Sequence, residues 1–364
     1  MSNIRFIHTS DIHLGTKLNN KNFSLKERQK RREELWDTFD EVINIAKNEQ
    51  ISYLFIAGDM TQSDYLNFKG LKRISQKFET IIDTNVIICC GKNDPYNINV
   101  LYEYFDWPKN VYFIKETENV QKIYFKEDNL CIYSLSWGNL TKNDNSQLIY
   151  DISVEEKMIN VLLLNCDTDS GTDNFSIDAD LIKNRFDYCA LGGKHQFTKV
   201  KDNVVYSGTP EPLSFDETGE HGIIKGLLEK ERLVYDFYPI AKRKYINRNI
   251  EVNLSYSFNK ILDMIKFSGD TISNIKDYIK VNLTGIVNAD ISMDEIKNEA
   301  KQFFYYIEFE ENFTYKNIDE NNFEDSDFNI IESYKLQFNN HNSNLEKKAF
   351  ELGLEVLRKE KVVN

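Results

Sequence analysis

The chain has 364 residues, enough for one large domain and a smaller one, and its 41% hydrophobic and 13% aromatic residues exclude a disordered chain. The formal net charge of −13 argues against strong nucleic-acid binding by the isolated chain, because a basic face supplies most of the affinity for phosphate. No secretory segment opens the sequence, no apolar run has the length of a membrane span, and the five cysteines lack C-x-x-C spacing, so we expect reduced thiols and a cytoplasmic protein without a membrane partner.

The first half of the chain alternates short apolar runs with amphipathic segments, and we expect the apolar runs to form buried strands at residues 4–8, 51–57, 86–90, 161–164 and 188–191. Ser24 and Glu27 have the spacing of a capping box, which predicts the start of a long helix, and a second helix is expected near residues 66–78. This pattern is typical of a sheet with helices on both faces. A hydrophobic period close to two in residues 111–137 and 204–238 indicates antiparallel strands.

The sequence pattern changes after Pro239, where residues 241–244 form a short basic segment that is a plausible domain boundary. We therefore predict two domains, residues 1–240 and residues 241–364, the second a small α+β unit. We expect the acidic, Asn-rich stretch at residues 317–327 to be a mobile loop. The strands expected in this unit are residues 278–283 and 305–309, and the helices are near residues 258–265, 293–303 and 345–359.

Polar side chains follow the expected strands at the points where the strands end. Asp11 and His13 come after the first strand, Asp59 after the second, Asp94 after the third and His195 after the last. Functional groups of such sheets gather beyond the carboxyl ends of the strands, so we expect these side chains to lie close together. Carboxylates and imidazoles suit manganese, iron or zinc, and a pair of such ions activates water and holds a phosphoryl group. The sequence therefore predicts a metal site at these strand ends.

Four blocks in this order resemble the motif series of the calcineurin-like phosphoesterases: Asp11-x-His13, Gly58-Asp59, Gly91-x-x-Asp94 and Gly192-x-x-His195. The chain is most similar to the bacterial SbcD-type and YhaO-type DNA repair exonuclease subunits, in FIHTSDIHLG at 6–15, YSGTPEPLSFDETGEHG at 206–222 and YIKVNLTG at 278–285. The resemblance implies an α/β (α+β) fold: a four-layer metallophosphoesterase sandwich of two β-sheets flanked by helices, plus a small C-terminal α+β capping domain. It also implies a hydrolase, a manganese-dependent phosphodiesterase or nuclease of DNA repair.

The resemblance implies that one metal ion is held by four residues, all of them present in this chain: Asp11, His13, Asp59 and His195. We therefore expect one divalent metal ion, manganese by resemblance, with iron or zinc as the alternatives. The simpler explanation is that these four are polar loop residues kept for folding.

The family's second ion is bridged by Asp59 and held by three further residues, whose positions are taken here by Lys92, Asn165 and Gly193. The Lys92 ammonium repels a cation, Gly193 has no ligating side chain, and Asn165 offers only an amide oxygen. We therefore expect this second site to be degenerate, either empty or replaced by the Lys92 ammonium. The alternative for Lys92 is a solvent-facing surface lysine.

Two neighbouring positions bear on catalysis. Asn93 stands where the family has its catalytic His, and an amide cannot donate a proton to a leaving group as that His does. Asp94, the next residue, matches the family and is expected to have a supporting role. By resemblance, no catalytic residue is intact.

Other residues that invite a functional interpretation have simpler explanations. Cys166 follows an expected strand and is more typical of a buried thiol than of a metal ligand. His8 lies inside the first strand and is expected to be structural, and His221 is expected to order its loop. The basic run at residues 28–32 fits a solvated helix face better than a phosphate contact, and the aromatic residues of 303–309 fit a core strand better than a stacking platform.

Three function hypotheses follow. The missing ligands of the second ion and the missing catalytic His favour a degenerate, non-catalytic member of the family with a binding or scaffolding role. By resemblance, its partners are an SbcC-like ABC ATPase with a coiled coil and DNA, docked through the C-terminal helix and the second domain. The family commonly dimerises, so a homodimer is a further expectation. The alternatives are an active manganese-dependent DNA phosphodiesterase or exonuclease that works with one metal ion, and a phosphoesterase for a small nucleotide.

Overall fold

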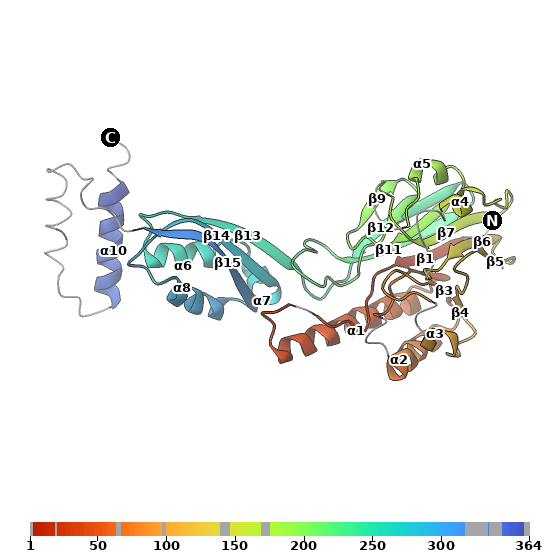
Figure 1. Cartoon of the computed structure of the whole chain (residues 1–364), viewed down its shortest axis with the longest axis horizontal. Coiled ribbons are helices and arrows are strands. Elements are labelled where there is room, and N and C mark those ends of the chain that lie inside the picture. Colours follow the sequence, from red (N-terminus) through yellow and green to blue (C-terminus); the bar gives the residue numbers. More distant parts are fainter. Residues whose placement is uncertain are drawn as a thin grey trace. The chain divides into compact units, whose positions relative to one another are not determined.

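The computed structural model describes residues 3–18, 20–62, 67–96, 100–138, 146–168, 175–316, 334 and 344–359. The chain divides into two compact units, Met1–Lys244 and Tyr245–Asn364, and each has a hydrophobic core of its own (Figure 1). The boundary predicted from the sequence was after residue 240. The loop expected at residues 317–327 lies outside the described residues.

The first unit contains two six-stranded sheets. The first sheet is made of β1 (Ile4–Thr9), β2 (Tyr53–Ala57), β3 (Asn85–Cys89), β4 (Val111–Phe113), β11 (Gly222–Glu229) and β12 (Arg232–Pro239). Its strand order is β12-β11-β1-β2-β3-β4, in which β1 to β4 are parallel to one another and β11 is antiparallel to both of its neighbours.

The second sheet is made of β5 (Gln121–Phe125), β6 (Leu130–Leu135), β7 (Ile159–Asn165), β8 (Tyr188–Gly192), β9 (Thr198–Lys201) and β10 (Val204–Tyr206). Its strand order is β5-β6-β7-β8-β10-β9, with antiparallel pairing only at the two edges. Within residues 111–137, the antiparallel prediction is therefore confirmed for β5 and β6, which pair with each other, and wrong for β4, which pairs in parallel with β3. Within residues 204–238 it is confirmed for β11 and β12. The period of two comes from β5, whose alternate side chains are exposed, whereas β6 is buried along its whole length.

Alternate side chains of the strands point to opposite faces of each sheet. Phe6 and Phe55 point into a core between the two sheets, where they meet Val161 of the second sheet. Their neighbours Ile7 and Leu54 point to the outer face of the first sheet. The two sheets therefore pack directly on each other.

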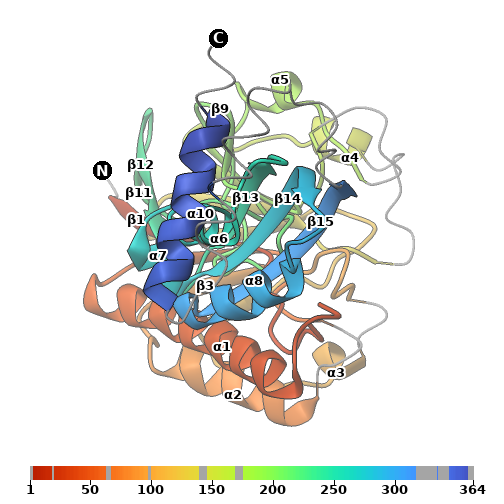
Figure 2. The same ribbon diagram turned by 90° about the vertical axis from the view of Figure 1, so that its left-hand side faces the viewer.

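Helices cover the two outer faces. Helices α1 (Leu25–Asn48), α2 (Phe68–Glu79) and the short α3 (Val100–Glu103) cover the first sheet, and α4 (Ser146–Tyr150) and α5 (Ala179–Ile182) cover the second. Helices α1 and α2 lie side by side in both views (Figures 1 and 2). The four-layer sandwich is confirmed, but each sheet has helices on one face only, because its other face is covered by the other sheet.

The predicted capping box opens α1. The Ser24 hydroxyl accepts a hydrogen bond from the N–H of Glu27 at 3.3 Å, and the Glu27 carboxylate accepts one from the N–H of Ser24 at 2.6 Å. The prediction of a solvated face for residues 28–32 is wrong for Arg31, which is fully buried and donates to the carboxylates of Glu34 and Glu211. Its charge is neutralised by Glu34, one turn further along α1, and by Glu211, whose proximity the sequence spacing does not reveal.

The second unit is a parallel three-stranded sheet covered by helices. It is made of β13 (Tyr245–Val252), β14 (Tyr278–Asn288) and β15 (Tyr306–Lys316), with α6 (Phe258–Lys266), α7 (Thr271–Lys276), α8 (Met293–Ala300), a 3₁₀ turn (Lys301–Phe303) and α10 (Asn344–Lys359). Helices α6 and α8 lie against the sheet (Figure 1). Their side chains form a core with Ile279, Val281 and Leu283 of β14. Within the described part of the chain, no helix is both long and apolar enough to cross a membrane.

Candidate metal centre

The ends of strands from both sheets meet at the candidate metal centre. Asp11 and His13 follow β1, and His195 follows β8. The ligand atoms of these three side chains all lie within 4.8 Å of one another, and among the described residues no other group of His, Cys, Asp and Glu has this geometry. The structure thus brings together three of the four residues that the family resemblance assigned to the first ion.

The backbone around the centre is held in an uncommon conformation. Asp11, His13 and Asp59 have φ angles of 52°, 51° and 50°, in the left-handed region. This region costs an L-residue with a side chain roughly 1–2 kcal/mol, and such strain clusters at functional sites. Hydrogen bonds between the two strand ends hold it: Asp11 N–H donates to the Gly58 carbonyl and His13 N–H to the Asp59 carbonyl, each at 3.0 Å.

The Asp11 carboxylate is fully buried at this centre. The Ser10 hydroxyl donates to its Oδ2 at 2.5 Å, and the Gly193 N–H donates to the same oxygen at 3.0 Å. Burial, and then the neighbouring charge of Asp59, raise the pKa of Asp11 to about 7. A buried carboxylate is costly without a compensating positive charge, so this position favours a bound cation.

The imidazoles of His13 and His195 have the spacing of two ligands on one ion. Their Nε2 atoms lie 3.3 Å apart, and two nitrogens bound at about 2.0–2.1 Å to one tetrahedral ion are separated by roughly 3.4 Å. Burial lowers the pKa of His13 below its ordinary value, which keeps this imidazole neutral, and its buried Nδ1 has no hydrogen-bond partner among the described residues. The residues therefore fit a metal ion.

A carboxylate that the sequence analysis missed lies behind His195. Oε1 of Glu217 is 2.6 Å from Nδ1 of His195, although the two residues are 22 positions apart. Burial opposes the imidazolium, but the Glu217 carboxylate and the charges of Asp11 and Asp59 together raise the pKa of His195 to about 9. The only sequence signal for Glu217 is its place in the family-like block at residues 206–222.

One carboxylate and two imidazoles form a donor set that suits manganese, iron or zinc. Asp11, His13 and His195 would hold such an ion. When bound, it would polarise a phosphoryl oxygen and lower the pKa of a bound water.

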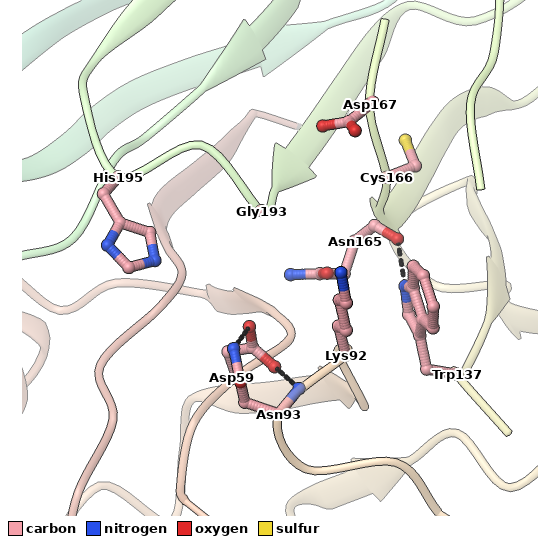
Figure 3. Close-up of a pocket in the computed structure, with 9 residues that line it drawn as sticks. All are labelled: Asp59, Lys92, Asn93, Trp137, Asn165, Cys166, Asp167, Gly193 and His195. Carbon is pink, nitrogen blue, oxygen red and sulfur yellow. Dashed lines mark hydrogen bonds between the residues drawn. The ribbon is translucent and has the colours of Figure 1, made fainter. Parts of the chain in front are cut away.

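Asp59, the fourth expected ligand, lies beside this group, and its carboxylate is bound by Asn93. The backbone N–H of Asn93 donates to Oδ1 of Asp59 at 2.7 Å, and the side-chain Nδ2 of Asn93 donates to Oδ2 at 2.8 Å (Figure 3). Each carboxylate oxygen of Asp59 therefore accepts a hydrogen bond from Asn93.

Asp94 supports the loop that carries these residues. Its buried carboxylate accepts hydrogen bonds from the N–H groups of Gly91 at 2.7 Å, Asp59 at 3.1 Å and Thr61 at 3.2 Å, and from the Tyr102 hydroxyl at 3.0 Å. Burial, and then the charge of Asp59, raise the pKa of Asp94 well above its ordinary value. Gly91 is needed here because a Cβ would lie 2.3 Å from Oδ1 of Asp59.

A cavity of about 160 Å³ is lined by the three residues that the resemblance assigned to the second ion, Lys92, Asn165 and Gly193. Nδ2 of Asn165 donates to the Ala57 carbonyl at 3.0 Å. Oδ1 of Asn165 points toward Gly193 and would lie 3.4 Å from a Cβ atom at that position. Lys92 is an exposed residue whose side chain extends along the cavity wall (Figure 3). The cavity is lined by Asp59, Lys92, Asn93, Trp137, Asn165, Cys166, Asp167, Gly193 and His195.

The remaining candidates have structural roles. Cys166 is buried, burial raises its pKa well above the ordinary value, and it belongs to no ligand cluster of the described residues. His221 contacts the backbone carbonyls of Thr209 at 3.1 Å and Glu217 at 3.2 Å, and so orders its loop as expected. In the segment 303–309, Tyr306 and Ile307 are buried core residues.

Residues 4–197 match the family model of the calcineurin-like phosphoesterases. The chain therefore belongs to the calcineurin-like phosphoesterase family. Among solved structures, 49 chains match. One of them, the crystal structure of TT1561 of Thermus thermophilus, is 10% identical with a TM-score of 0.37, over 65% of this chain and 98% of that chain. That likeness is too weak to carry a functional argument, and no curated protein matches.

Proposed function

We propose that this protein is a relative of the SbcD-type and YhaO-type nuclease subunits with little or no phosphodiesterase activity. It holds one divalent metal ion, for which manganese is the first candidate. The observation that carries the proposal is the pair of hydrogen bonds from Asn93 to the two carboxylate oxygens of Asp59. These oxygens are the atoms that Asp59 would offer to a metal ion, so the two hydrogen bonds compete with metal binding at Asp59. The first ion keeps its own ligands in Asp11, His13 and His195.

The substituted positions remove two parts of a two-metal mechanism. Lys92 places a cation at the second ion's cavity and Gly193 supplies no ligand, so one side of the phosphoryl clamp is missing. Asn93 cannot protonate a leaving group. The loss of an ion and of a general acid together lowers a hydrolysis rate by orders of magnitude.

A chain with this site serves as a binding or scaffolding subunit. The partners in this proposal are an SbcC-like ABC ATPase and DNA. The proposed oligomeric state is a homodimer, and the proposed location is the cytoplasm. Because the chain carries a net charge of −13, the partner supplies most of the basic surface that DNA requires.

The metal content and the hydrolysis rate of the purified chain together test this proposal. After reconstitution with excess manganese, we expect one ion per chain by mass spectrometry of the metal, and none in Asp11→Asn. Asp167→Asn, which changes a carboxylate of the neighbouring cavity, is the control and keeps the ion. Hydrolysis of bis-nitrophenyl phosphate and of duplex DNA stays at the background rate.

Two results contradict the proposal. Two manganese ions per chain overturn the single-ion site. Rapid manganese-dependent hydrolysis that Asp59→Ala abolishes identifies the chain as an active phosphodiesterase that works with one ion, which is the alternative function.

A further inference from the structure

The loop between β10 and β11 supplies a carboxylate to Nδ1 of His195, the ring nitrogen that faces away from His13. Oε1 of Glu217 lies 2.6 Å from Nδ1 of His195. The Glu217 side chain is 15% exposed and the His195 side chain 31%, so the contact is largely shielded from water. A charged hydrogen bond of this length in such surroundings is strong.

The loop fixes Glu217 from several directions. Its second carboxylate oxygen, Oε2, accepts the N–H of Leu213 at 2.7 Å. Its backbone N–H donates to the Ser214 carbonyl at 3.1 Å, and its carbonyl contacts Nε2 of His221 at 3.2 Å. The backbone contacts hold the Glu217 main chain in place, and its side chain cannot turn away from His195 without also breaking the hydrogen bond from Leu213.

The same loop is attached to the backbone of the ligand. The N–H of Thr209 donates to the His195 carbonyl at 2.9 Å, and the Thr209 carbonyl contacts Nδ1 of His221. His221 thus joins the two ends of the loop, one held against the His195 backbone and the other against the His195 ring.

This arrangement determines the tautomer of His195. A carboxylate only accepts hydrogen bonds, so Nδ1 of His195 carries the hydrogen. A metal ion binds the neutral imidazole, in which Nε2 presents its lone pair, and this is the atom that faces Nε2 of His13 at 3.3 Å. A carboxylate on the distal nitrogen also makes an imidazole a more basic ligand.

We propose that Glu217 is a positioning residue of the metal centre, which fixes the tautomer and the ring orientation of His195 for a divalent ion held with Asp11 and His13. This inference rests on the proposed single-ion site. It adds that the affinity of the site depends on a residue that does not touch the ion.

The test compares manganese dissociation constants of full-length variants by isothermal titration calorimetry. We expect Glu217→Gln to raise the dissociation constant by about 10- to 100-fold, and Glu217→Asp to recover part of the loss because it keeps the charge. The control is Glu220→Gln in the same loop, whose side chain is 52% exposed and pairs with Lys244, and which leaves the constant unchanged.

Two further measurements separate positioning from a general structural role. The thermal midpoint of the metal-free Glu217→Gln protein stays close to that of the unaltered chain, whereas the visible absorption of its cobalt-substituted form shifts. An unchanged manganese dissociation constant in Glu217→Gln, while the unaltered chain binds one ion, overturns this inference and leaves the single-ion proposal standing. An unaltered chain that binds no ion overturns both.

Discussion

His8 links the two sheets of the first unit through its ring. It lies in β1 and is fully buried. Its Nδ1 accepts a hydrogen bond from the Tyr188 hydroxyl at 2.9 Å, and its Nε2 donates to the Leu191 carbonyl at 3.2 Å, both in β8. Burial disfavours the charged ring, and in the neutral imidazole the Nε2–H that donates to Leu191 leaves Nδ1 as the acceptor. Burial accordingly lowers the pKa of His8 from 6.5 to about 3.

This buried histidine predicts a loss of stability in acid. The unfolded chain protonates His8 near pH 6.5 and the folded chain only near pH 3, so the unfolded state binds more protons between these values. The free energy of unfolding therefore falls by roughly 1.4 kcal/mol per pH unit below about pH 6 from this residue alone. Chemical denaturation at several pH values measures this change in the free energy of unfolding. His8→Gln keeps a hydrogen-bond donor and cannot titrate, so the free energy of unfolding of this variant should depend less on pH. An equal pH dependence in the variant and the unaltered chain contradicts the role of His8.

The residues that meet at the metal centre were predictable to different degrees. Asp11 and His13 follow the same buried strand, so their spacing places them at one strand end. His195 follows a strand of the other sheet, and its place beside them depends on how the two sheets pack, which only the family resemblance implied. Glu217 follows no strand end, and its contact with His195 depends on the path of a loop. The hydrogen bonds of Asn93 to Asp59 depend on side-chain geometry that spacing does not determine.

At the level of elements, a buried ionic network joins α1 to the loop after β10. The Arg31 guanidinium donates to Glu34 at 2.6 Å and to Glu211 at 2.7 Å, and the Arg31 side chain is 0% exposed. Oε2 of Glu211 also accepts the Thr38 hydroxyl at 2.8 Å and the N–H of Lys242 at 2.6 Å. The network thus attaches the helix layer both to the loop that carries Glu217 and to the end of the first unit.

Removal of one charge from this network is expected to be costly. Glu211→Gln removes a charged partner from Arg31, which is fully buried, and breaking such a buried pair destabilises a protein by about 3 kcal/mol. The control is Asp180→Asn, which removes an exposed carboxylate paired with Lys183 and Lys201 and changes stability little. Urea denaturation compares the two variants, and equal midpoints contradict the network's role.

Element prediction succeeded where a local signal exists. The capping box at Ser24 and the apolar runs of β1, β2 and β3 are local, and the structure has the elements there. Strand β13 was not predicted, because Asn247, Asn249 and Glu251 make its exposed face polar and it follows the short basic segment. The burial of Arg31 was also unpredictable, since Glu211 lies 180 positions away in the sequence.

At the level of the whole molecule, the proposed metal function belongs to one unit. The candidate ligands, Asn93 and Glu217 all lie within Met1–Lys244, and the core between the two sheets is formed by residues of this unit. The second unit has a separate core around β14. Folding and ion binding of the first unit therefore need no residue of the second.

We accordingly predict that a protein of residues 1–244 folds cooperatively and binds one manganese ion with the affinity of the full chain. An ion that binds only the folded state raises stability by about 2.7 kcal/mol when its concentration is 100 times the dissociation constant. The rise in thermal midpoint on adding manganese should therefore appear in the truncated and the full-length protein alike, and disappear from both with Asp11→Asn. A truncated protein that folds but binds no manganese, while the full chain binds it, assigns part of the site to the second unit and contradicts the prediction.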